Sequence, residues 1–428
     1  MLDFRPPLDS PLLIALVKFL MPLYMKLGLN DTTISVSPEA LERFSKLRGK
    51  KALICPNHSF RHDPQVMFAF SKLVDEDFNY IAAREVFDWD HGLNGWWLQH
   101  VGAYSVVRGA VDRESFKTTR EILSSGKKKL VLFPEGEISR QNDTLMPLES
   151  GAAQMSFWAL SDIKKVNPDD TIYIIPMALK YTYPYDIGSS IREAIGRLET
   201  KLNLSPFAEQ EGKLKQEIES ASDSAQYRVR RIAEKLLSVL EKEYKQKPAA
   251  DATMNQRVET LRRAILAKVA KQLDVQLPAG NRELENVRIL RNTLDDYIYQ
   301  AETKDLSEYE KQIHEENAAS IKACYKDLDR VVNFISIYDG YVTEHMSQER
   351  YSHVLDRMEQ EVFGGAPTLR GSRLVLIDVG EPINLSDHLD AYKLKKKEAV
   401  AKVTDEIFSQ ISSMLHGLEA KRKPVFLQ

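Results

Sequence analysis

Short apolar runs alternate with helix-like segments between residues 50 and 185, and this alternation constrains the fold more than any other feature of the chain. The helix-like segments include residues 113–125 and 151–161. The apolar runs that we interpret as strands are residues 51–56, 79–83, 103–107, 129–134 and 171–181. Strands that alternate with helices are typical of α/β folds. We therefore expect an α/β fold, a mixed but largely parallel sheet flanked by helices.

The composition changes after Tyr185, where the chain becomes rich in Glu, Lys, Gln and Ala. Apolar residues now recur at helical spacing, as in the two stripes Val229, Ile232, Leu236, Leu240 and Val258, Leu261, Ile265, Val269. Such stripes indicate a bundle of amphipathic helices. Strand character returns at residues 372–385, and an amphipathic helix follows at residues 393–415.

This pattern predicts one α/β domain that a large all-helical insertion interrupts. We expect an N-terminal helical segment at residues 1–35, an α/β core at 36–186, the insertion at 187–368, and a return to the core with a C-terminal helix at 369–428. The insertion is also a candidate surface for homo-oligomerisation or for binding another partner.

Charge and cysteine content exclude several classes of function. The chain has 428 residues, and 59 Lys and Arg stand against 62 Asp and Glu, which gives a formal charge of −3. A protein that mainly binds nucleic acid usually has a basic excess, so we expect no nucleic-acid partner. The two cysteines, Cys55 and Cys324, exclude a disulfide scaffold and a zinc site built from cysteines. A mean hydropathy of −0.36 argues against a polytopic membrane protein.

Residues 11–29 are the most apolar stretch, but Lys18, Pro22 and Lys26 interrupt it. A lysine at the centre of a bilayer costs about 3 kcal/mol, which disfavours a spanning helix. A signal peptide also fits poorly, because two acidic residues accompany a single arginine before this stretch. A helix that lies in the membrane surface, with its lysines reaching the headgroups, fits better. The alternatives are a helix packed on the core and a true span. We expect a cytoplasmic protein that associates peripherally with a membrane surface.

A polar cluster directly follows the strand predicted at residues 51–56, and it contains Asn57, His58, Arg61, His62 and Asp63. Open α/β sheets place ligand sites just beyond the carboxyl ends of their strands. His58 and Asp63 are five positions apart, which on one straight helix sets them about 140° out of phase. They can meet only if His58 lies on the loop that enters a helix and Asp63 lies in its first turn. The carboxylate would then orient the imidazole, whose other nitrogen could accept a proton from a hydroxyl.

Two other interpretations of this cluster remain open from the residues alone. His58 and His62 are four positions apart and could bind a metal ion from one helix face, as in a metal-dependent hydrolase. The segment lacks the glutamate of an HExxH motif, and no third ligand is evident nearby. Alternatively, His58 could simply cap the helix.

Two further polar segments also follow predicted strands. Glu135, Gly136 and Glu137 come after the strand at residues 129–134, and Gly136 permits a tight turn whose N–H groups suit an anionic oxygen. Arg108 follows the strand at residues 103–107 and could clamp a phosphate. Taken singly, the first is also compatible with an ordinary turn and the second with a surface ion pair.

Together and in this order, the segments resemble the motifs of the glycerolipid acyltransferase superfamily, which includes lysophosphatidate and glycerol-phosphate acyltransferases. The resemblance covers residues 12–185 and 372–385. The matching motifs, in chain order, are Asn57-His58-x4-Asp63 (the HxxxxD motif), residues 102–108, Phe133-Pro134-Glu135-Gly136, Ile175-Pro176-Met177-Ala178 and Gly380-Glu381-Pro382-Ile383.

The resemblance implies an acyltransferase of phospholipid biosynthesis in which His58 is the general base and Asp63 orients it. The acceptor's hydroxyl would attack the thioester of acyl-CoA or of acyl carrier protein, without a metal or another cofactor. The acceptor would be a glycerolipid such as 1-acyl-sn-glycerol 3-phosphate, held at the membrane surface. The substrate-binding residues that it implies are Asn57, Ser59, Arg61, Arg108, Glu135, Gly136 and Glu137.

One departure from the family pattern concerns the acceptor. The family commonly continues Thr-Arg-Ser after the glycine of the third motif, whereas this chain continues Glu137-Ile138-Ser139-Arg140. An acidic Glu137 should repel a phosphate unless Arg140 or Arg61 reaches it. This departure motivates the alternative of a catalytically inactive, lipid-binding scaffold at the membrane, whose helical insertion recruits partners.

Overall fold

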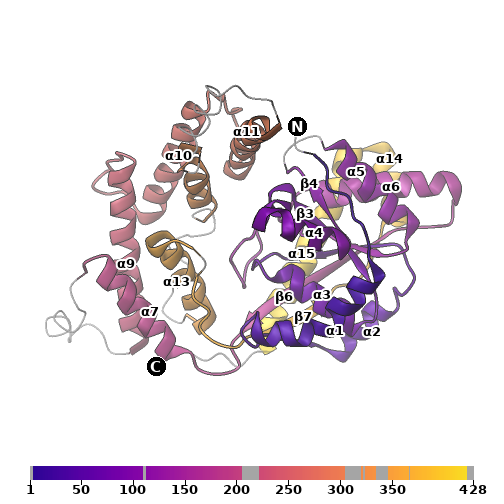
Figure 1. Cartoon of the computed structure of the whole chain (residues 1–428), viewed down its shortest axis with the longest axis horizontal. Coiled ribbons are helices and arrows are strands. Elements are labelled where there is room, and N and C mark those ends of the chain that lie inside the picture. The colour runs from indigo at the N-terminus through magenta and orange to yellow at the C-terminus, as the bar shows by residue number, and fades with distance from the viewer. Residues whose placement is uncertain are drawn as a thin grey trace. The chain divides into compact units, whose positions relative to one another are not determined.

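A computed structural model describes residues 3–108, 112–204, 221–303, 320–321, 323–333, 346–365 and 367–421 of the chain. The chain forms two compact units (Figure 1). The core unit comprises Asp3–Pro184 and Gly371–Lys423, and the helical unit contains Tyr185–Arg370. The sequence had predicted the helical insertion as residues 187–368.

The core unit is built on one eight-stranded sheet with the order β1-β7-β6-β2-β5-β3-β4, in which β8 also pairs with β6. Its strands are β1 (Thr33–Val36), β2 (Ala52–Pro56), β3 (Phe78–Ala83), β4 (Ala103–Val106), β5 (Lys129–Val131), β6 (Tyr173–Thr182), β7 (Leu374–Val379) and β8 (Ile383–Asn384). All pairs are parallel except β6 with β7 and β6 with β8. The predicted mixed, largely parallel sheet is therefore confirmed.

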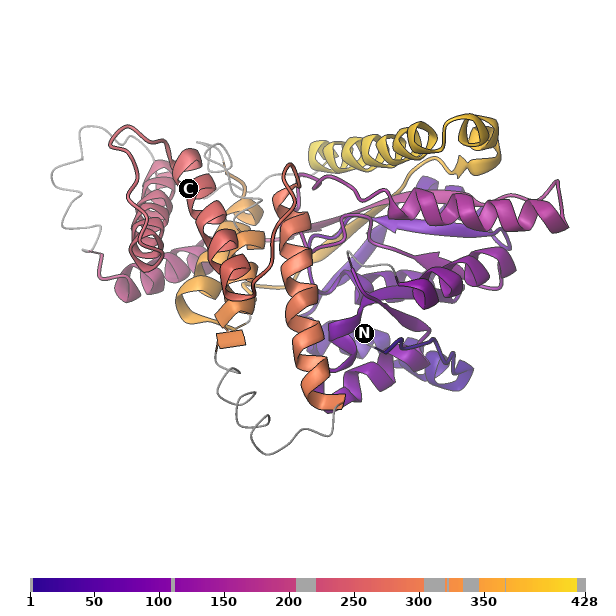
Figure 2. The same cartoon turned by 90° about the horizontal axis from the view of Figure 1, so that it is seen from above.

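Helices cover both faces of this sheet. One face packs against α1 (Pro11–Leu27), α2 (Pro38–Ser45) and α3 (Asp63–Leu73), and the other against α5 (Arg113–Ser125), α6 (Gly151–Val166), α14 (Leu389–Leu394) and α15 (Lys396–Lys421). In Figure 2 the yellow helix α15 and the magenta helix α6 lie on the same side of the sheet. Each face has its own apolar core. Within β2, Ile54 belongs to the core beneath α1, α2 and α3, whereas Leu53 and Cys55 belong to the core on the opposite face, as the alternation of side chains along a strand requires.

Local signals explain where the helices begin and end. At α5, the side chain of Asp112 accepts a hydrogen bond from the Ser115 N–H at 3.0 Å, and Gly126 ends the helix with a φ of +64°. At α2, Ser37 caps the N-terminus and Pro38 occupies the first turn. The predicted helix at residues 113–125 is confirmed in full.

The N-terminal apolar stretch forms α1, which packs on the core along one side only. Ile14, Met21 and Met25 are buried, whereas much of the remaining apolar surface of the helix faces solvent. For a helix in the membrane surface we expected Lys18 to extend away from the protein, but it turns toward the core unit instead. Its Nζ lies 2.6 Å from Asp77 Oδ1 and 2.9 Å from the Glu76 carbonyl oxygen. Among the residues that the structure describes, no helix combines the length and apolar character needed to cross a bilayer.

The helical unit contains α7 (Gly188–Lys201), α9 (Ala221–Glu243), α10 (Met254–Gln272), α11 (Glu283–Thr303) and α13 (Gln348–Phe363). The two apolar stripes that the sequence showed at helical spacing lie on α9 and α10, and every one of their residues is buried. The predicted helical character of this segment is confirmed. Packing of these stripes against neighbouring helices supplies the apolar core of the unit.

Candidate active site

The candidate site lies at the edge of the sheet where the parallel strands end. The loops that follow β2, β4 and β5 leave from this edge, and β6 ends there. Because β7 runs antiparallel to β6, with Thr182 opposite Leu374, β7 begins at the same edge. Residues after β2 and residues before β7 are thus brought together from distant parts of the sequence.

His58 and Asp63 form a hydrogen-bonded pair at this edge. His58 lies on the loop after β2, Asp63 is the first residue of α3, and His58 Nδ1 is 2.9 Å from Asp63 Oδ2. This is the geometry that the five-residue spacing required. Since the carboxylate is an acceptor, Nδ1 carries the proton, and Nε2 keeps its lone pair. The His58 side chain is 15% exposed, so Nε2 belongs to a ring that solvent and substrates can reach.

Three donors hold the Asp63 carboxylate in place. Oδ2 accepts the Phe60 N–H at 2.9 Å in addition to the His58 bond, and Oδ1 accepts the Tyr181 hydroxyl at 2.6 Å. Asp63 itself is fully buried. A buried carboxylate with this many donors is fixed in orientation, so it can orient the imidazole.

The loop that carries His58 is fixed by the loop after β5. Glu135 Oε1 accepts the His58 N–H at 2.5 Å, and Oε2 accepts the Met146 N–H at 2.9 Å. The Ser139 N–H in turn donates to the His58 carbonyl oxygen at 2.7 Å. The ring of Phe133 stacks on the His58 imidazole with a centroid distance of 4.2 Å. The two loops therefore position the histidine through its backbone and its ring face.

Glu135 is completely buried, and this burial raises the pKa of its carboxyl to about 8, although its two backbone N–H donors oppose the shift. Both oxygens are occupied within the protein. The side chain thus supports the loop, and a direct contact between Glu135 and a substrate stays a prediction.

Two asparagine side chains extend the sheet beyond the end of β2. Asn57 accepts the Leu179 N–H at 2.6 Å and donates to the Leu179 carbonyl at 3.0 Å. Asn142 does the same two residues further along β6, with the Tyr181 N–H at 2.7 Å and the Tyr181 carbonyl at 2.6 Å. Asn57 also donates to Ser59 Oγ at 3.2 Å, and both are buried. These side-chain amides make the backbone hydrogen bonds with β6 that a neighbouring strand would otherwise make, and they anchor the loops to β6. Substrate contacts of Asn57 and Ser59 stay predictions.

Arg108 and Glu137, from the second and third motif segments, form an ion pair at 2.8 Å. Arg108 also donates to the Gly136 carbonyl at 2.9 Å and pairs with Glu85. Gly136 has a φ of +69°, the left-handed conformation that the predicted tight turn requires. The positive charge of Arg108 is therefore opposed by two carboxylates, and a phosphate here would compete with both. Phosphate binding by Arg108 and this turn stays a prediction.

His62 and Arg61 lie at the start of α3. The exposed Arg61 donates from Nε to His62 Nε2 at 3.1 Å, and the guanidinium of Arg373 lies 3.5 Å from His62 Nδ1. Burial, followed by the charges of Arg373 and Arg61, lowers the pKa of His62 to about 4. Across the described ranges, no three His, Cys, Asp or Glu residues are grouped so that they could hold a metal ion. Two guanidinium groups around His62 also form poor surroundings for a cation.

Sequence reasoning missed Tyr181, Arg373 and Asn142. Tyr181 is the penultimate residue of β6, and Arg373 precedes β7, the strand that returns after the helical unit. Only the register of β6 with β7 brings the two residues to the site. Asn142 occurs seven residues after Glu135, in a loop whose sequence has no regular period. For Tyr181 and Arg373, the sequence signal that could have identified them as site residues is a polar or aromatic residue at a strand end.

A solvent-accessible histidine paired with a buried carboxylate at the carboxyl edge of an α/β sheet is the arrangement of an enzyme that activates a hydroxyl group. Residues 35–180 match the family model described as Acyltransferase, and this segment carries both His58 and Asp63. This part of the chain belongs to the glycerolipid acyltransferase family, and the protein is an acyltransferase enzyme. A search of curated proteins found no match to the chain.

Proposed function

We propose that the protein moves a fatty acyl group from an acyl thioester to a hydroxyl of a glycerolipid acceptor of the 1-acyl-sn-glycerol 3-phosphate type. The observation that carries this proposal is the contact of His58 Nδ1 with Asp63, which leaves Nε2 as a proton acceptor beside solvent. The Acyltransferase family match supports the reaction class, and the motif resemblance supports the acceptor class.

In the proposed reaction, His58 Nε2 takes the proton of the acceptor's hydroxyl while its oxygen attacks the thioester carbonyl carbon. The C–O bond forms, the C–S bond breaks, and the departing sulfur receives the proton from the imidazolium. The products are an ester and a free thiol. Asp63 stabilises the transient positive charge on His58 and keeps Nδ1 protonated. The donor is acyl-CoA or acyl carrier protein, and the step uses no metal or other cofactor.

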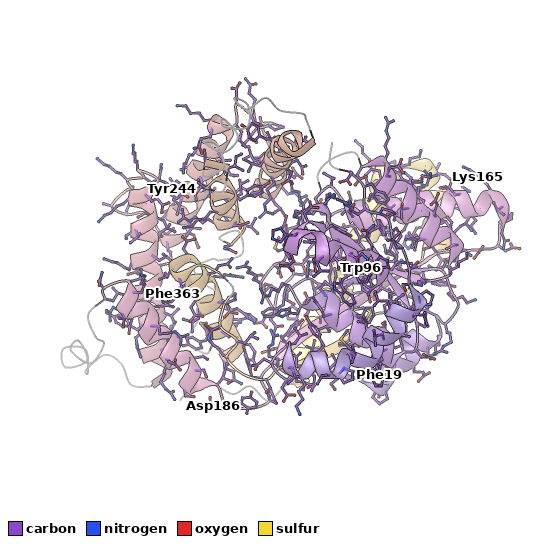
Figure 3. The ribbon with its side chains drawn as sticks, viewed as in Figure 1. Phe19, Trp96, Lys165, Asp186, Tyr244 and Phe363 are labelled. Atoms are coloured by element: carbon purple, nitrogen blue, oxygen red, sulfur yellow. The ribbon has the colours of Figure 1, made fainter. Side chains whose placement is uncertain are left out.

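We further propose that the core unit docks on the cytoplasmic surface of a membrane through α1 and α4 (Leu93–His100). Large exposed apolar side chains gather on these elements and on the turn before α4: Leu12, Leu16, Phe19, Leu20, Leu23, Tyr24, Leu27, Trp89, Leu93, Trp96 and Trp97. We call this set the apolar face, and Figure 3 labels Phe19 and Trp96 on it. The Ser10 N–H donates to the His100 carbonyl at 2.9 Å, which joins the start of α1 to the end of α4. Tryptophans among aliphatic residues suit the interface of a bilayer, where acceptors with acyl chains reside.

The experiment that tests the reaction is transfer of labelled acyl groups from acyl-CoA and from acyl carrier protein by the purified full chain. The acceptors are lysophosphatidate and other lysophospholipids, glycerol phosphate and neutral alcohols. We expect transfer to a lysolipid by the wild type and a loss of about 10²–10⁴-fold in His58→Ala. His416→Ala is the matched control, because His416 is exposed on α15 and makes one local contact with the Ser412 carbonyl.

Full activity of His58→Ala would contradict the mechanism. Binding of vesicles by both proteins without transfer to any acceptor would instead support the alternative, a lipid-binding scaffold with a partner-binding helical unit.

A further inference from the structure

Arg373 is a buried arginine that has no carboxylate partner among the residues that the structure describes. Its side chain lies over the rings of Phe60 and Tyr181, with its guanidinium carbon 5.5 Å and 5.1 Å from their centroids. The residue is 4% exposed, and its Nε has no hydrogen-bond partner in the described part of the chain. Tyr181 is one of the three donors to Asp63, so Arg373 stacks on a direct support of the candidate catalytic pair.

Within the described ranges, the guanidinium of Arg373 has one polar side-chain contact, with His62, and this contact is poor. Nη2 lies 3.5 Å from His62 Nδ1, which is longer than an ordinary N–H hydrogen bond. A neutral imidazole has one acceptor nitrogen, and His62 Nε2 already accepts the Arg61 Nε–H at 3.1 Å. Nδ1 of His62 therefore carries a proton that faces an N–H of Arg373. An oxygen atom that accepts from both of these donors would satisfy them.

Charge at this point is also unbalanced. Neither Arg61 nor Arg373 lies within ion-pairing distance of a carboxylate in the described part of the chain. Asp63 is the carboxylate that acts on His62, and its oxygens are already occupied by His58, Phe60 and Tyr181. Arg108 differs, because Glu137 and Glu85 both pair with it. The uncompensated positive charge of the site is at Arg61 and Arg373.

We propose that Arg61, His62 and Arg373 form the anion-binding site of this acyltransferase, which takes a phosphate group carried by one of its two substrates. The site is adjacent to the catalytic pair through the chain connection from His58 to Arg61 and through the stack of Arg373 on Tyr181. Arginine suits this role, because its planar fork of N–H donors matches phosphate oxygens. The proposal rests on the proposed function for the identity of the substrates, but not for the binding of the anion.

Binding is tested first without turnover. The probe is inorganic phosphate, compared with chloride at equal ionic strength, and the readout is the thermal unfolding of the full chain. We expect phosphate to raise the unfolding temperature of the wild type by about 2–4 °C and to have little effect on Arg61→Gln and Arg373→Gln. Arg373→Lys should keep part of the effect. The control is Arg113→Gln, an exposed arginine in the first turn of α5, which should behave as the wild type.

Equal stabilisation of all variants, or of none, would overturn the anion site and leave the proposed reaction untouched. Arg61 is exposed, so Arg61→Gln tests the site even if Arg373→Gln fails to fold.

Kinetics then identify which substrate carries the phosphate. The acceptors are lysophosphatidate and its neutral counterpart monoacylglycerol, and the donors are acyl-CoA and a phosphate-free acyl thioester of N-acetylcysteamine. In Arg61→Gln we expect kcat/KM to fall about 10–100-fold, mainly through KM, only for pairs that contain the recognised phosphate. A loss that follows lysophosphatidate assigns the phosphate to the acceptor, and one that follows acyl-CoA assigns it to the donor. An equal loss for the neutral acceptor with the phosphate-free thioester would contradict the proposal.

Discussion

The hydroxyl of Tyr181, at the end of β6, donates a 2.6 Å hydrogen bond to Oδ1 of Asp63, at the start of α3. Burial and the Asp63 charge raise the pKa of this tyrosine well above its ordinary value, so it remains a donor throughout the working range of pH. The bond holds the carboxylate on the side opposite His58.

Tyr181→Phe tests this positioning role. We expect kcat to fall about 3–10-fold with KM nearly unchanged, because one donor to the carboxylate is lost while His58 and the substrate contacts remain. Asp63→Asn, measured in parallel by acyl transfer, should lose about 10³–10⁴-fold, because the amide no longer selects the protonated Nδ1. Equal losses in the two variants would show that Tyr181 does more than position Asp63.

Asn57→Ala and Asn142→Ala are a matched pair, since each removes two hydrogen bonds to the backbone of β6. Each should lower the free energy of unfolding by about 1–3 kcal/mol in urea denaturation, because buried N–H and C=O groups lose their partners. Activity should fall more in Asn57→Ala, because Asn57 precedes His58 directly. Equal activity losses at a temperature where both variants are folded would contradict a specific role for the Asn57 anchor.

His62 gives the protein a stability that depends on pH. Its pKa is about 4 in the folded chain against an ordinary value of 6.5, so the unfolded state binds more protons between these values. The contribution of His62 to the free energy of unfolding, about 1–3 kcal/mol, is therefore fully present above about pH 6.5 and is lost as the pH falls toward 4. In urea denaturation, the free energy of unfolding should decrease less between pH 7 and pH 5 for His62→Gln than for the wild type. An identical loss would mean that His62 is not held neutral by burial and its arginine neighbours.

Each unit contains one buried cysteine, and burial raises the pKa of both thiols. Cys55 lies in β2 of the core unit and Cys324 in the helical unit. We expect both to react with iodoacetamide at least about 10³-fold more slowly in the native protein than in urea. Peptide mapping after labelling at increasing urea should then report the opening of the two units separately. Rapid native labelling of either cysteine would show that its unit opens readily.

The double variant Leu16→Ser with Phe19→Ser should bind phospholipid vesicles about tenfold or more weakly, because it removes exposed apolar area from the apolar face. Its unfolding temperature should be unchanged, since neither side chain packs in the core. The control is Val166→Ser at the end of α6, which packs on the other face of the sheet; Lys165, its neighbour, is labelled in Figure 3. Equal weakening by the control would argue against docking through α1.

The sequence was sufficient wherever the signal is local. The strands other than β1, helix α5 and the pairing of His58 with Asp63 follow from apolar runs, capping residues and the entry of a helix within five residues. β1 was missed because its four residues alternate between exposed and half-buried positions at the sheet edge. The sequence also suggested that Glu137 would repel a phosphate. It could not show that the loops after β4 and β5 meet, so that Glu137 binds Arg108. Arg373 and the ion pair of Lys18 with Asp77 likewise depend on tertiary contacts.

The ends of the helical unit are held together by its own packing. Gln348, at the start of α13, accepts the Ile187 N–H and donates to the Tyr185 carbonyl, each at 3.0 Å, and α7 packs on α13. In the chain, the helical unit lies between β6, which carries Tyr181, and β7, which directly follows Arg373. An unfolded insertion would make closure of this strand pair entropically costly, whereas a folded one brings the two strands within reach. A folded helical unit therefore lowers the entropic cost of completing the edge of the sheet that holds the catalytic pair.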